Sequence, residues 1–431
     1  MANKIKNKLR WVRLDNAAKI YPAARRKNWS NVFRQSVTLC EEVNTEILKS
    51  ALEIVVKRFP SIAARLRKGA FWYYLQQVES APDIKEEYSY PLVFMSKEEM
   101  RKCAFRVIVY YNRIAVEFFH SLTDGTGALI FLKNLVAEYL ERKHNITIPL
   151  EHGILDRREP PREEELEDCF LKNAAKVTAS RKATNAWKLP GEPQMDGFLN
   201  LTCFQIPVKD ALDAAHSYDS TLTVFINAVM MTAINEFQKE KNPSLKHREK
   251  VKVLIPINLR NLFPSKTLRN FAMYTTPEID PRLGEYTFEE ICNIIKHKMG
   301  TEFTAKFMSC VIATNVNDEK NPILRLVPLP VKNAIMKAVF DSVGEKKSCL
   351  SLSNLGQVKV PEIMMPYIER FDFILGAQAD APYNCGMLSY GDTIYINFIR
   401  STKEAELERH FYKVLQKLGI PVLVESNRNE R

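Results

Sequence analysis

The sequence predicts an α/β protein organised in two halves. Strand-like runs of β-branched and aromatic residues alternate with amphipathic stretches along the whole chain, which is the pattern of an α/β fold. At 431 residues the chain is longer than one hydrophobic core usually organises. A proline-rich, charged segment at 151–197 interrupts the alternation. We therefore predict a first half at 1–150, an interdomain crossover at 151–197 and a second half at 198–431.

The first half begins with a short strand at 11–14 and an irregular loop at 16–31. A helix capped by Asn44 or Thr45 carries an apolar stripe and ends at Pro60. Periodicity and turn residues predict the remaining strands at 32–40, 62–66, 71–76, 103–111 and 114–119. A second helix follows Gly127, because apolar residues recur at helical spacing as far as Leu140.

The crossover is expected to contain some helix, at about 164–182. In the second half an apolar helix starts at Thr221 or Thr223 and runs through Phe237. Thr287 caps another helix, and 405–418 forms the last one. The predicted strands of this half are 199–206, 251–257, 271–275, 349–352, 371–375 and 388–399.

Composition narrows the class of protein. Lys and Arg number 62 against 51 Asp and Glu, a formal net charge of +11 that suits an anionic ligand. The basic runs are too short for nucleic-acid arms. The 8 cysteines are scattered, and neither they nor the histidines show the spacing of a metal site, so reduced thiols in a cytoplasmic protein are the simplest account. We expect no signal peptide and no stable membrane insertion, because no run is apolar enough for either.

The most informative stretch lies where the strand at 114–119 ends. His120 follows this strand directly, and Asp124-Gly125-Thr126-Gly127 turns the chain into the next helix. An imidazole at a strand end can project into a cleft, and its pKa near neutrality suits a general base. Asp124 can cap the helix or pair with a cation. The alternative is a surface loop in which both side chains have only a structural role.

A faint internal repeat supports two related halves. The segment 114–121 can be aligned with 394–401, and each follows a turn and precedes an amphipathic helix. Arg400 stands at the position of His120 in the second copy, and no Asp-Gly follows it. If the halves share a fold, only the first keeps the chemical group, and Arg400 should tolerate substitution without loss of the chemical step. Chance similarity between two strand-turn-helix units is the alternative.

Several short motifs together resemble one superfamily. Phe119-His120-Ser121-Leu122-Thr123-Asp124-Gly125 resembles the His-His-x-x-x-Asp-Gly motif of the chloramphenicol-acetyltransferase-like superfamily, with Phe119 in place of the first histidine. The segments 256–260, 270–271 and 353–356 resemble further signatures of its alcohol acetyltransferases. The resemblance covers nearly the whole chain and is greatest to the stand-alone bacterial form of these enzymes.

The resemblance implies a fold and an activity. The fold would be two chloramphenicol-acetyltransferase-like α/β sandwiches that form a pseudo-dimer with a central tunnel. The activity would be acyl transfer from an acyl-CoA co-substrate to an alcohol, with His120 as general base and the Asp124-Gly125 turn completing the catalytic motif. Ser353, Asn354 and Arg260 would serve the substrate side, and Arg260 is also the best partner for Asp124. No metal and no permanently bound cofactor are expected, and one chain should work as a monomer.

Two other functions stay open at this point. A condensation-type enzyme would take its acyl group from a carrier-protein thioester and form an amide or ester, so the acceptor could be an amine. A non-catalytic relative would only bind a lipid or partner in its tunnel. His120 and Asp124 are both present, which disfavours the non-catalytic reading. No nucleic-acid partner is expected for any of the three.

Overall fold

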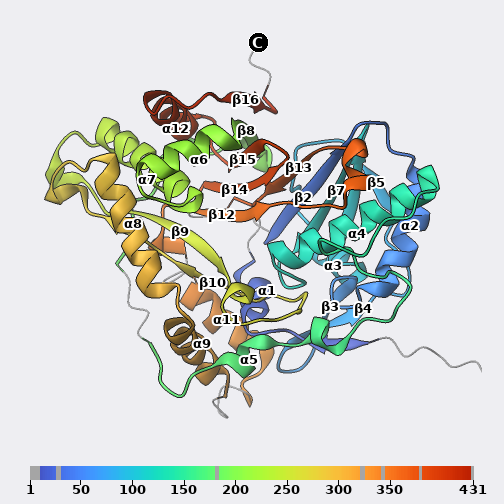
Figure 1. Ribbon diagram of the computed structural model, residues 1–431. Coiled ribbons are helices and arrows are strands. Elements are labelled where there is room, and N and C mark those ends of the chain that lie inside the picture. The colour runs from blue at the N-terminus through green and yellow to red at the C-terminus, as the bar shows by residue number, and fades with distance from the viewer. Residues whose placement is uncertain are drawn as a thin grey trace, which may run out of the picture.

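The structure is a computed structural model that describes residues 10–25, 31–179, 184–320, 326–340, 345–377 and 381–428. Three sheets organise it (Figure 1). The first, of five strands, has the order β13 (Ile368–Ile374), β2 (Val32–Leu39), β7 (Arg113–Phe119), β6 (Phe105–Tyr110) and β5 (Ile84–Glu86). The second, of eight strands, has the order β10 (Ala272–Thr275), β9 (Val251–Asn258), β12 (Leu350–Gln357), β14 (Tyr383–Tyr390), β15 (Thr393–Arg400), β8 (Asn200–Pro207) and β16 (Leu423–Ser426), with β11 (Glu278–Ile279) also paired to β9. A small third sheet has the order β1 (Trp11–Arg13), β4 (Tyr73–Gln77) and β3 (Ala64–Lys68).

Helices are found in both halves and in the crossover. In the first half they are α1 (Ile20–Ala24), α2 (Thr45–Arg58), α3 (Lys97–Lys102) and α4 (Gly125–His144). The crossover holds α5 (Cys169–Asn173), and the second half holds α6 (Val208–Ser217), α7 (Leu222–Lys241), α8 (Phe288–Glu302), α9 (Ala305–Lys320), α11 (Leu329–Val339) and α12 (Glu406–Lys417). Figure 1 shows α2 and α4 beside the first sheet, and α6, α7 and α12 beside the second. This mixed α/β architecture confirms the predicted fold class.

Local sequence signals explain where the main helices begin. Asn44 caps α2 by accepting a hydrogen bond from the backbone N–H of Ile47 at 3.1 Å, and Thr221 caps α7. Thr287 and Glu290 form a reciprocal capping box at the start of α8. Each cap satisfies backbone donors that the first turn of a helix leaves unpaired. The predicted helix starts at these three places are confirmed.

Other predicted elements need correction. The segment 16–31 is not an irregular loop throughout, because Ala17–Lys19 and α1 are helical, and Asp15 accepts a hydrogen bond from the Ala18 N–H at 2.7 Å. In its described residues the crossover holds α5 and the short turns Glu163–Leu166 and Met195–Gly197 instead of a long helix. The run 388–399 belongs to a hairpin, β14 and β15. α6, α9 and α11 were not predicted. The helical segments of 16–31 and of the crossover, by contrast, have only three to five residues each and are too short to show helical periodicity.

A strand from the second half completes the first sheet. β13 pairs antiparallel with β2, and Phe371 and Phe373 belong to the hydrophobic core of the first half. The sequence does not show this exchange, because strand pairing over more than 300 positions leaves no local signal. The predicted boundaries at 150 and 198 therefore divide the sequence into halves, but they do not separate the sheets. β13 comes from the second half and is a strand of the first sheet.

Gly386 makes the junction of the two sheets possible. A Cβ atom on this β14 residue would lie 2.2 Å from the backbone oxygen of Phe373 in β13. Only glycine permits such a close approach between two backbones.

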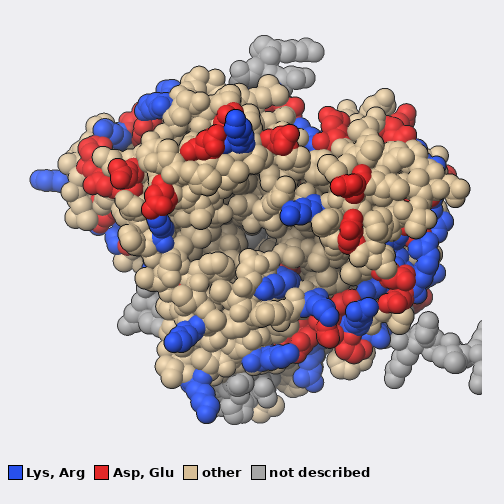
Figure 2. Space-filling view, in the orientation of Figure 1, with Lys and Arg blue, Asp and Glu red and all other residues tan. Residues whose placement is uncertain are grey.

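The surface view shows a face that is hollowed between the two halves, with Lys and Arg side chains near the hollow (Figure 2).

The two halves also share a strand-turn-helix unit. β6 and β7 form a hairpin that leads into α4, and β14 and β15 form a hairpin that leads into α12. The segments of the faint sequence repeat therefore occupy matching places in their sheets.

Candidate active site

His120 lies at the C-terminal end of β7, between the two halves. Its backbone N–H donates to the carbonyl of Asn31 at 2.9 Å, which holds the strand end against β2. Tyr21 stacks on the imidazole, with ring centroids 4.3 Å apart and planes inclined by 12°. Phe33 meets the ring edge-on at 5.0 Å. Two aromatic side chains therefore hold the plane of the imidazole, while the ring remains half-buried.

The surroundings of His120 favour the neutral imidazole. Burial among aromatic groups lowers the pKa of His120 below its usual 6.5, although the Asp124 carboxylate acts in the opposite direction. A buried histidine loses hydration that would stabilise the charged form. The ring is therefore neutral at physiological pH and able to accept a proton.

Asn270 contacts His120 at two points. The Oδ1 atom of Asn270 lies 3.1 Å from the imidazole Nδ1, and its Nδ2 donates to the His120 carbonyl at 3.0 Å. The same Nδ2 also lies 3.3 Å from Oδ2 of Asp15. The sequence analysis assigned no role to Asn270 or Asp15. Asn270 belongs to the segment 270–271 that resembles a family signature, which was the only signal for it.

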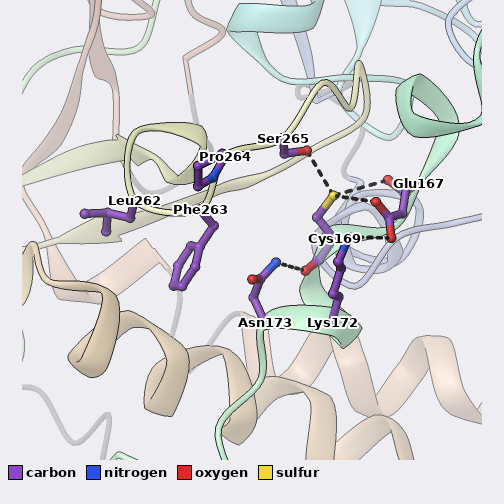
Figure 3. Close-up of a pocket in the computed structure, with 8 residues that line it drawn as sticks. All are labelled: Glu167, Cys169, Lys172, Asn173, Leu262, Phe263, Pro264 and Ser265. Carbon is purple, nitrogen blue, oxygen red and sulfur yellow. Dashed lines mark hydrogen bonds and ion pairs between the residues drawn. The ribbon is translucent and has the colours of Figure 1, made fainter.

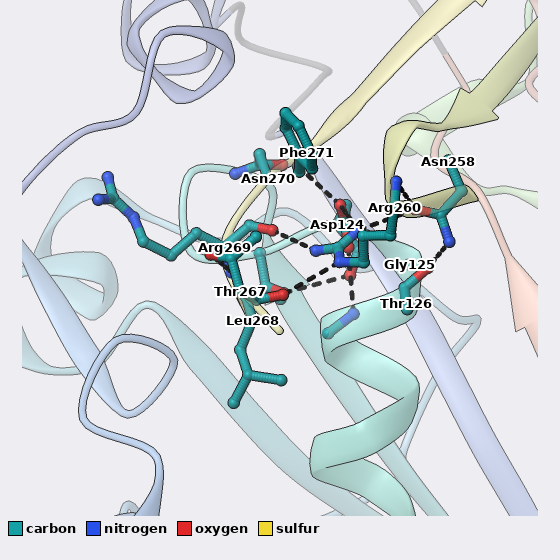
Figure 4. A network of polar contacts seen from close by, with 12 residues as sticks. Asp124, Gly125, Thr126, Asn258, Arg260, Thr267, Leu268, Arg269, Asn270 and Phe271 are labelled. Atoms are coloured by element: carbon teal, nitrogen blue, oxygen red, sulfur yellow. Dashed lines mark hydrogen bonds and ion pairs between the residues drawn. The ribbon is translucent and has the colours of Figure 1, made fainter. Parts of the chain in front are cut away.

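Asp124 is held by three contacts and forms the predicted ion pair (Figure 4). Its Oδ1 accepts from the Gly127 N–H at 3.1 Å and so caps α4. Its Oδ2 accepts from Nη1 of Arg260 at 2.8 Å and from the backbone N–H of Phe271 at 2.8 Å. The carboxylate of the first half is thereby tied to the second half. Both of its oxygens are occupied by protein donors.

Arg260 is equally well satisfied within the protein. Nε donates to the Thr267 carbonyl at 3.0 Å, and Nη2 donates to the Arg269 carbonyl at 2.7 Å. Nη1 is shared between Asp124 and the side-chain oxygen of Asn258. These bonds fold the segment 258–271 around the guanidinium (Figure 4). Arg260 therefore stabilises the conformation of the loop that carries Asn270.

The glycines of the motif allow close packing at the start of α4. A Cβ atom on Gly127 would lie 2.2 Å from Oγ1 of Thr123 and 2.3 Å from the Leu268 carbonyl. On Gly125 it would meet the side chain of Leu355 at 2.7 Å. The Gly125 carbonyl accepts from Nε2 of Gln35 at 2.7 Å. The motif thus packs directly on β12 of the other half.

Ser353 and Asn354 lie within β12, which corrects the predicted end of that strand at Leu352. The strand continues to Gln357 because β14 pairs with it past Asn354, through an irregularity in register. Nδ2 of Asn354 donates to Oγ1 of Thr223 at 3.1 Å, and its Oδ1 accepts from the Gly356 N–H at 2.7 Å. No hydrogen bond within the described ranges joins Ser353 or Asn354 to His120. The half-buried Ser353 hydroxyl has no partner among these residues.

Arg400 occupies the place of His120 in the second half but has a different environment. It is 2% exposed and pairs with Glu408 on α12, and its Nη1 lies 3.3 Å from Oγ1 of Thr202. Burial raises the pKa of Glu408, while Arg400 opposes this effect. Arg400 is therefore part of the core of the second half rather than of a cleft.

Two other features lie away from His120. A cavity of about 150 Å³ is lined by α5 and the loop 262–265, where Sγ of Cys169 lies 3.1 Å from Oγ of Ser265 (Figure 3). Burial raises the pKa of the Cys169 thiol, so this sulfur is a poor nucleophile. Among the described residues, Glu240, Glu406 and His410 could together ligate a metal ion. Arg409 donates to both carboxylates, so a cation of the protein already pairs with them.

The helices in the described ranges include none with the length and apolarity needed to cross a bilayer. All 8 cysteines are free thiols.

Comparison with known proteins identifies the fold. No family model and no curated protein sequence matches the chain. Solved structures do match over almost the whole chain. The trichothecene 15-O-acetyltransferase TRI3 from Fusarium sporotrichioides is 12% identical, with 95% of this chain and 94% of that chain covered and a TM-score of 0.58.

Two further structures extend the comparison. TRI101 of F. graminearum, solved with coenzyme A and T-2 mycotoxin, is 11% identical, with coverages of 93% and 96% and a TM-score of 0.59. The first condensation domain of the CDA synthetase is 9% identical, with coverages of 97% and 99% and a TM-score of 0.57. Acetyltransferases and condensation domains share this architecture from end to end. The present chain therefore has the chloramphenicol-acetyltransferase-like fold that the motifs around His120 predicted.

Proposed function

We propose that this protein is an acyltransferase that moves an acyl group from an acyl-CoA thioester to an alcohol. The observation that carries the proposal is the neutral, half-buried imidazole of His120 at a strand end between the two halves. Its plane is held by Tyr21 and its loop by the Asp124–Arg260 pair. The fold shared with a 15-O-acetyltransferase and with a protein solved with coenzyme A supports the same assignment.

In this reaction His120 is the general base. It takes the proton of the acceptor hydroxyl as the oxygen attacks the thioester carbonyl, and a new C–O bond forms. The carbonyl oxygen becomes an oxyanion, and the C–S bond then breaks. The imidazolium returns its proton to the leaving thiolate, so protons balance and no acyl-enzyme is needed.

The oxyanion needs a hydrogen-bond donor on the side of the site that faces His120. We propose the Ser353 hydroxyl for this role, because it is half-buried, lies on β12 two residues before Leu355, and has no partner among the described residues. Leu355 itself packs against Gly125, which brings this strand to the start of α4. Asn354 holds the turn at Gly356, and Asp124 and Arg260 position the His120 loop. The hollow between the halves is the expected mouth of the tunnel (Figure 2).

The test is a donor and acceptor screen that follows release of free thiol. Acyl-CoA donors of increasing chain length would be offered with a panel of simple alcohols, and His120→Ala would serve as the negative control. Thiol release that needs both an alcohol and His120 is the expected result. Release without any acceptor would indicate thioester hydrolysis instead.

A condensation-type reaction is the second candidate, because a condensation domain has the same fold over 97% of this chain. The two functions differ in the donor. Turnover with an acylated carrier protein and an amine or alcohol acceptor, but none with CoA thioesters, would select the condensation reaction.

We also propose that the enzyme acts as a monomer in the cytoplasm. The 8 free thiols suit a reducing compartment, and one chain supplies both walls of the site.

A further inference from the structure

The bonds of Asn270 determine which nitrogen of His120 carries the proton. The His120 carbonyl can only accept a hydrogen bond, so the Asn270 atom that lies 3.0 Å from it must be the amide nitrogen. The amide oxygen of Asn270 therefore faces the imidazole Nδ1, at 3.1 Å. An oxygen acceptor at this distance requires a hydrogen on Nδ1. The lone pair of the neutral ring must then be on Nε2.

Asp15 completes the chain of contacts behind Asn270. Its Oδ2 lies 3.3 Å from the Asn270 Nδ2 and gives that amide a second acceptor. Asp15 is 1% exposed and Asn270 is 2% exposed, so neither group exchanges its partner for water. Asp15 is fixed in turn by the Ala18 N–H at 2.7 Å and by Arg269, whose Nη2 lies 3.7 Å from its carboxylate.

Contacts with the aromatic neighbours do not by themselves determine which ring atom of His120 faces Asn270. Stacking on Tyr21 fixes the plane of the imidazole, but a rotation of the ring by half a turn about the Cβ–Cγ bond leaves that plane unchanged. Such a rotation would replace Nδ1 by a carbon atom opposite Asn270. The hydrogen bond to Asn270 therefore distinguishes the two orientations of the ring, alongside the backbone groups of His120 and Thr123 that also act on the imidazole.

We propose that Asn270 is a positioning residue that holds His120 as its Nδ1–H tautomer, with Asp15 holding Asn270 in turn. This deepens the proposed function and rests on it for the role of Nε2, which becomes the nitrogen that takes the acceptor's proton. When Nε2 is protonated, the Nδ1–H bond to Asn270 is kept, so the imidazolium forms without movement of the ring. Asn270 touches no reacting atom and acts through His120 alone.

The direct test is nitrogen NMR of the imidazoles, in protein labelled at its 7 histidines. Comparison with His120→Gln identifies the His120 signals. We expect Nδ1 protonated and Nε2 unprotonated in the wild type at neutral pH. In Asn270→Ala we expect loss of this single form, toward the Nε2–H tautomer. A wild-type His120 protonated on Nε2, or an unchanged Nδ1–H signal in Asn270→Ala, would overturn the proposal.

Kinetics supply the second test. Asn270→Ala should lower kcat by about 10–100-fold, the size typical of a lost supporting contact, with the KM for the donor little changed. Asn270→Asp keeps an acceptor for Nδ1, and Asp15→Asn in the same chain removes the carboxylate that would otherwise lie 3.3 Å from the new one. The carboxylate beside the imidazole in this double variant should raise the pKa of His120 and move the acid limb of the rate profile to higher pH. If Asn270→Ala fails to fold, the double variant still carries the test, because an acid limb that does not move contradicts the proposal.

The matched control is Asn134→Ala. Asn134 is also a buried asparagine of the first half, and it bonds the carbonyls of Ile130 and Gly153 and the Leu155 N–H. Its loss should lower the melting temperature and leave kcat and the imidazole spectrum unchanged. The NMR arm needs no substrate. A protein that shows the Nδ1–H tautomer and its loss in Asn270→Ala, but no thiol release, would refute the acyl-transfer function and not the role of Asn270.

Discussion

Asp124 and Arg260 are 136 positions apart in the sequence, and their side chains form an ion pair of 2.8 Å that joins the helix after His120 to the other half of the molecule. The carboxylate at the same time caps α4, and the guanidinium organises the segment that carries Asn270. One pair of charges therefore sets the geometry on both sides of the imidazole.

Loss of this pair should reduce activity through the His120 loop. Asp124→Asn leaves the largely buried Arg260 without its counter-charge, and breaking such a pair typically costs about 3–5 kcal/mol. We expect a lower free energy of unfolding in denaturant titration, together with a fall in kcat.

The control for the cap alone is Ser96→Ala, because Ser96 caps α3 through the Glu99 N–H at 3.0 Å. Loss of that cap should cost about 1 kcal/mol and leave kcat unchanged. An Asp124→Asn enzyme with wild-type stability and a large loss of kcat would show that Asp124 acts in the chemistry rather than in the loop.

His120→Ala should lower turnover by about 10²–10⁴-fold, the usual contribution of a general base. The ring is only half-buried, so the melting temperature should change little. His144→Ala is the matched control, because His144 also stacks on a tyrosine, Tyr367, with centroids 4.2 Å apart. An active His120→Ala enzyme, measured with substrates that the wild type converts, would refute the mechanism.

The pH profile should report the lowered pKa of His120. Only the neutral ring accepts a proton, so the rate falls as pH drops through the pKa of this group. Because burial lowers that pKa below 6.5, we expect the midpoint of the acid limb to lie below pH 6.5. The measurement is kcat/KM against pH, with enzyme stability checked at each point. A limb centred above 6.5 would contradict the burial effect.

Gly386→Ala should weaken the junction of the two sheets. The added Cβ would lie 2.2 Å from the Phe373 oxygen, and a backbone atom cannot move aside as a side chain can. Such overpacking costs about 1–3 kcal/mol, which thermal or denaturant unfolding would detect. Gly300→Ala is the control, because its Cβ would meet nothing within 4 Å and α8 gains a better helix former. Equal stability of the two variants would show that β13 and β14 can move apart without loss of stability.

For Arg400 we predict a loss of stability without a loss of activity. Arg400→Ala leaves the 4%-exposed Glu408 without its ion-pair partner, so we expect a loss of about 3–5 kcal/mol in stability and an unchanged kcat for the folded enzyme. The double variant Arg400→Met with Glu408→Gln removes both charges and should recover much of the loss. A double variant no more stable than Arg400→Ala would show that lost packing, and not the unpaired charge, causes the loss of stability.

The sequence by itself determined the α/β class, most strands, the caps of α2, α7 and α8, and the place of His120 at a strand end. These features depend on side-chain alternation, on periodicity and on capping residues within a few positions, so local patterns carry them. The pairing of Asp124 with Arg260 was also predicted, but only through the resemblance to a known superfamily.

Only the tertiary structure decided which distant groups meet. Asn270 reaches His120 across 150 positions, and Asp15 reaches Asn270 across 255. β13 crosses into the first sheet, and Ser353 lies inside a strand because β14 extends the pairing. Such contacts depend on how strands far apart in the chain are ordered in a sheet, and that order is set by the packing of the whole core. No local pattern of residues records it.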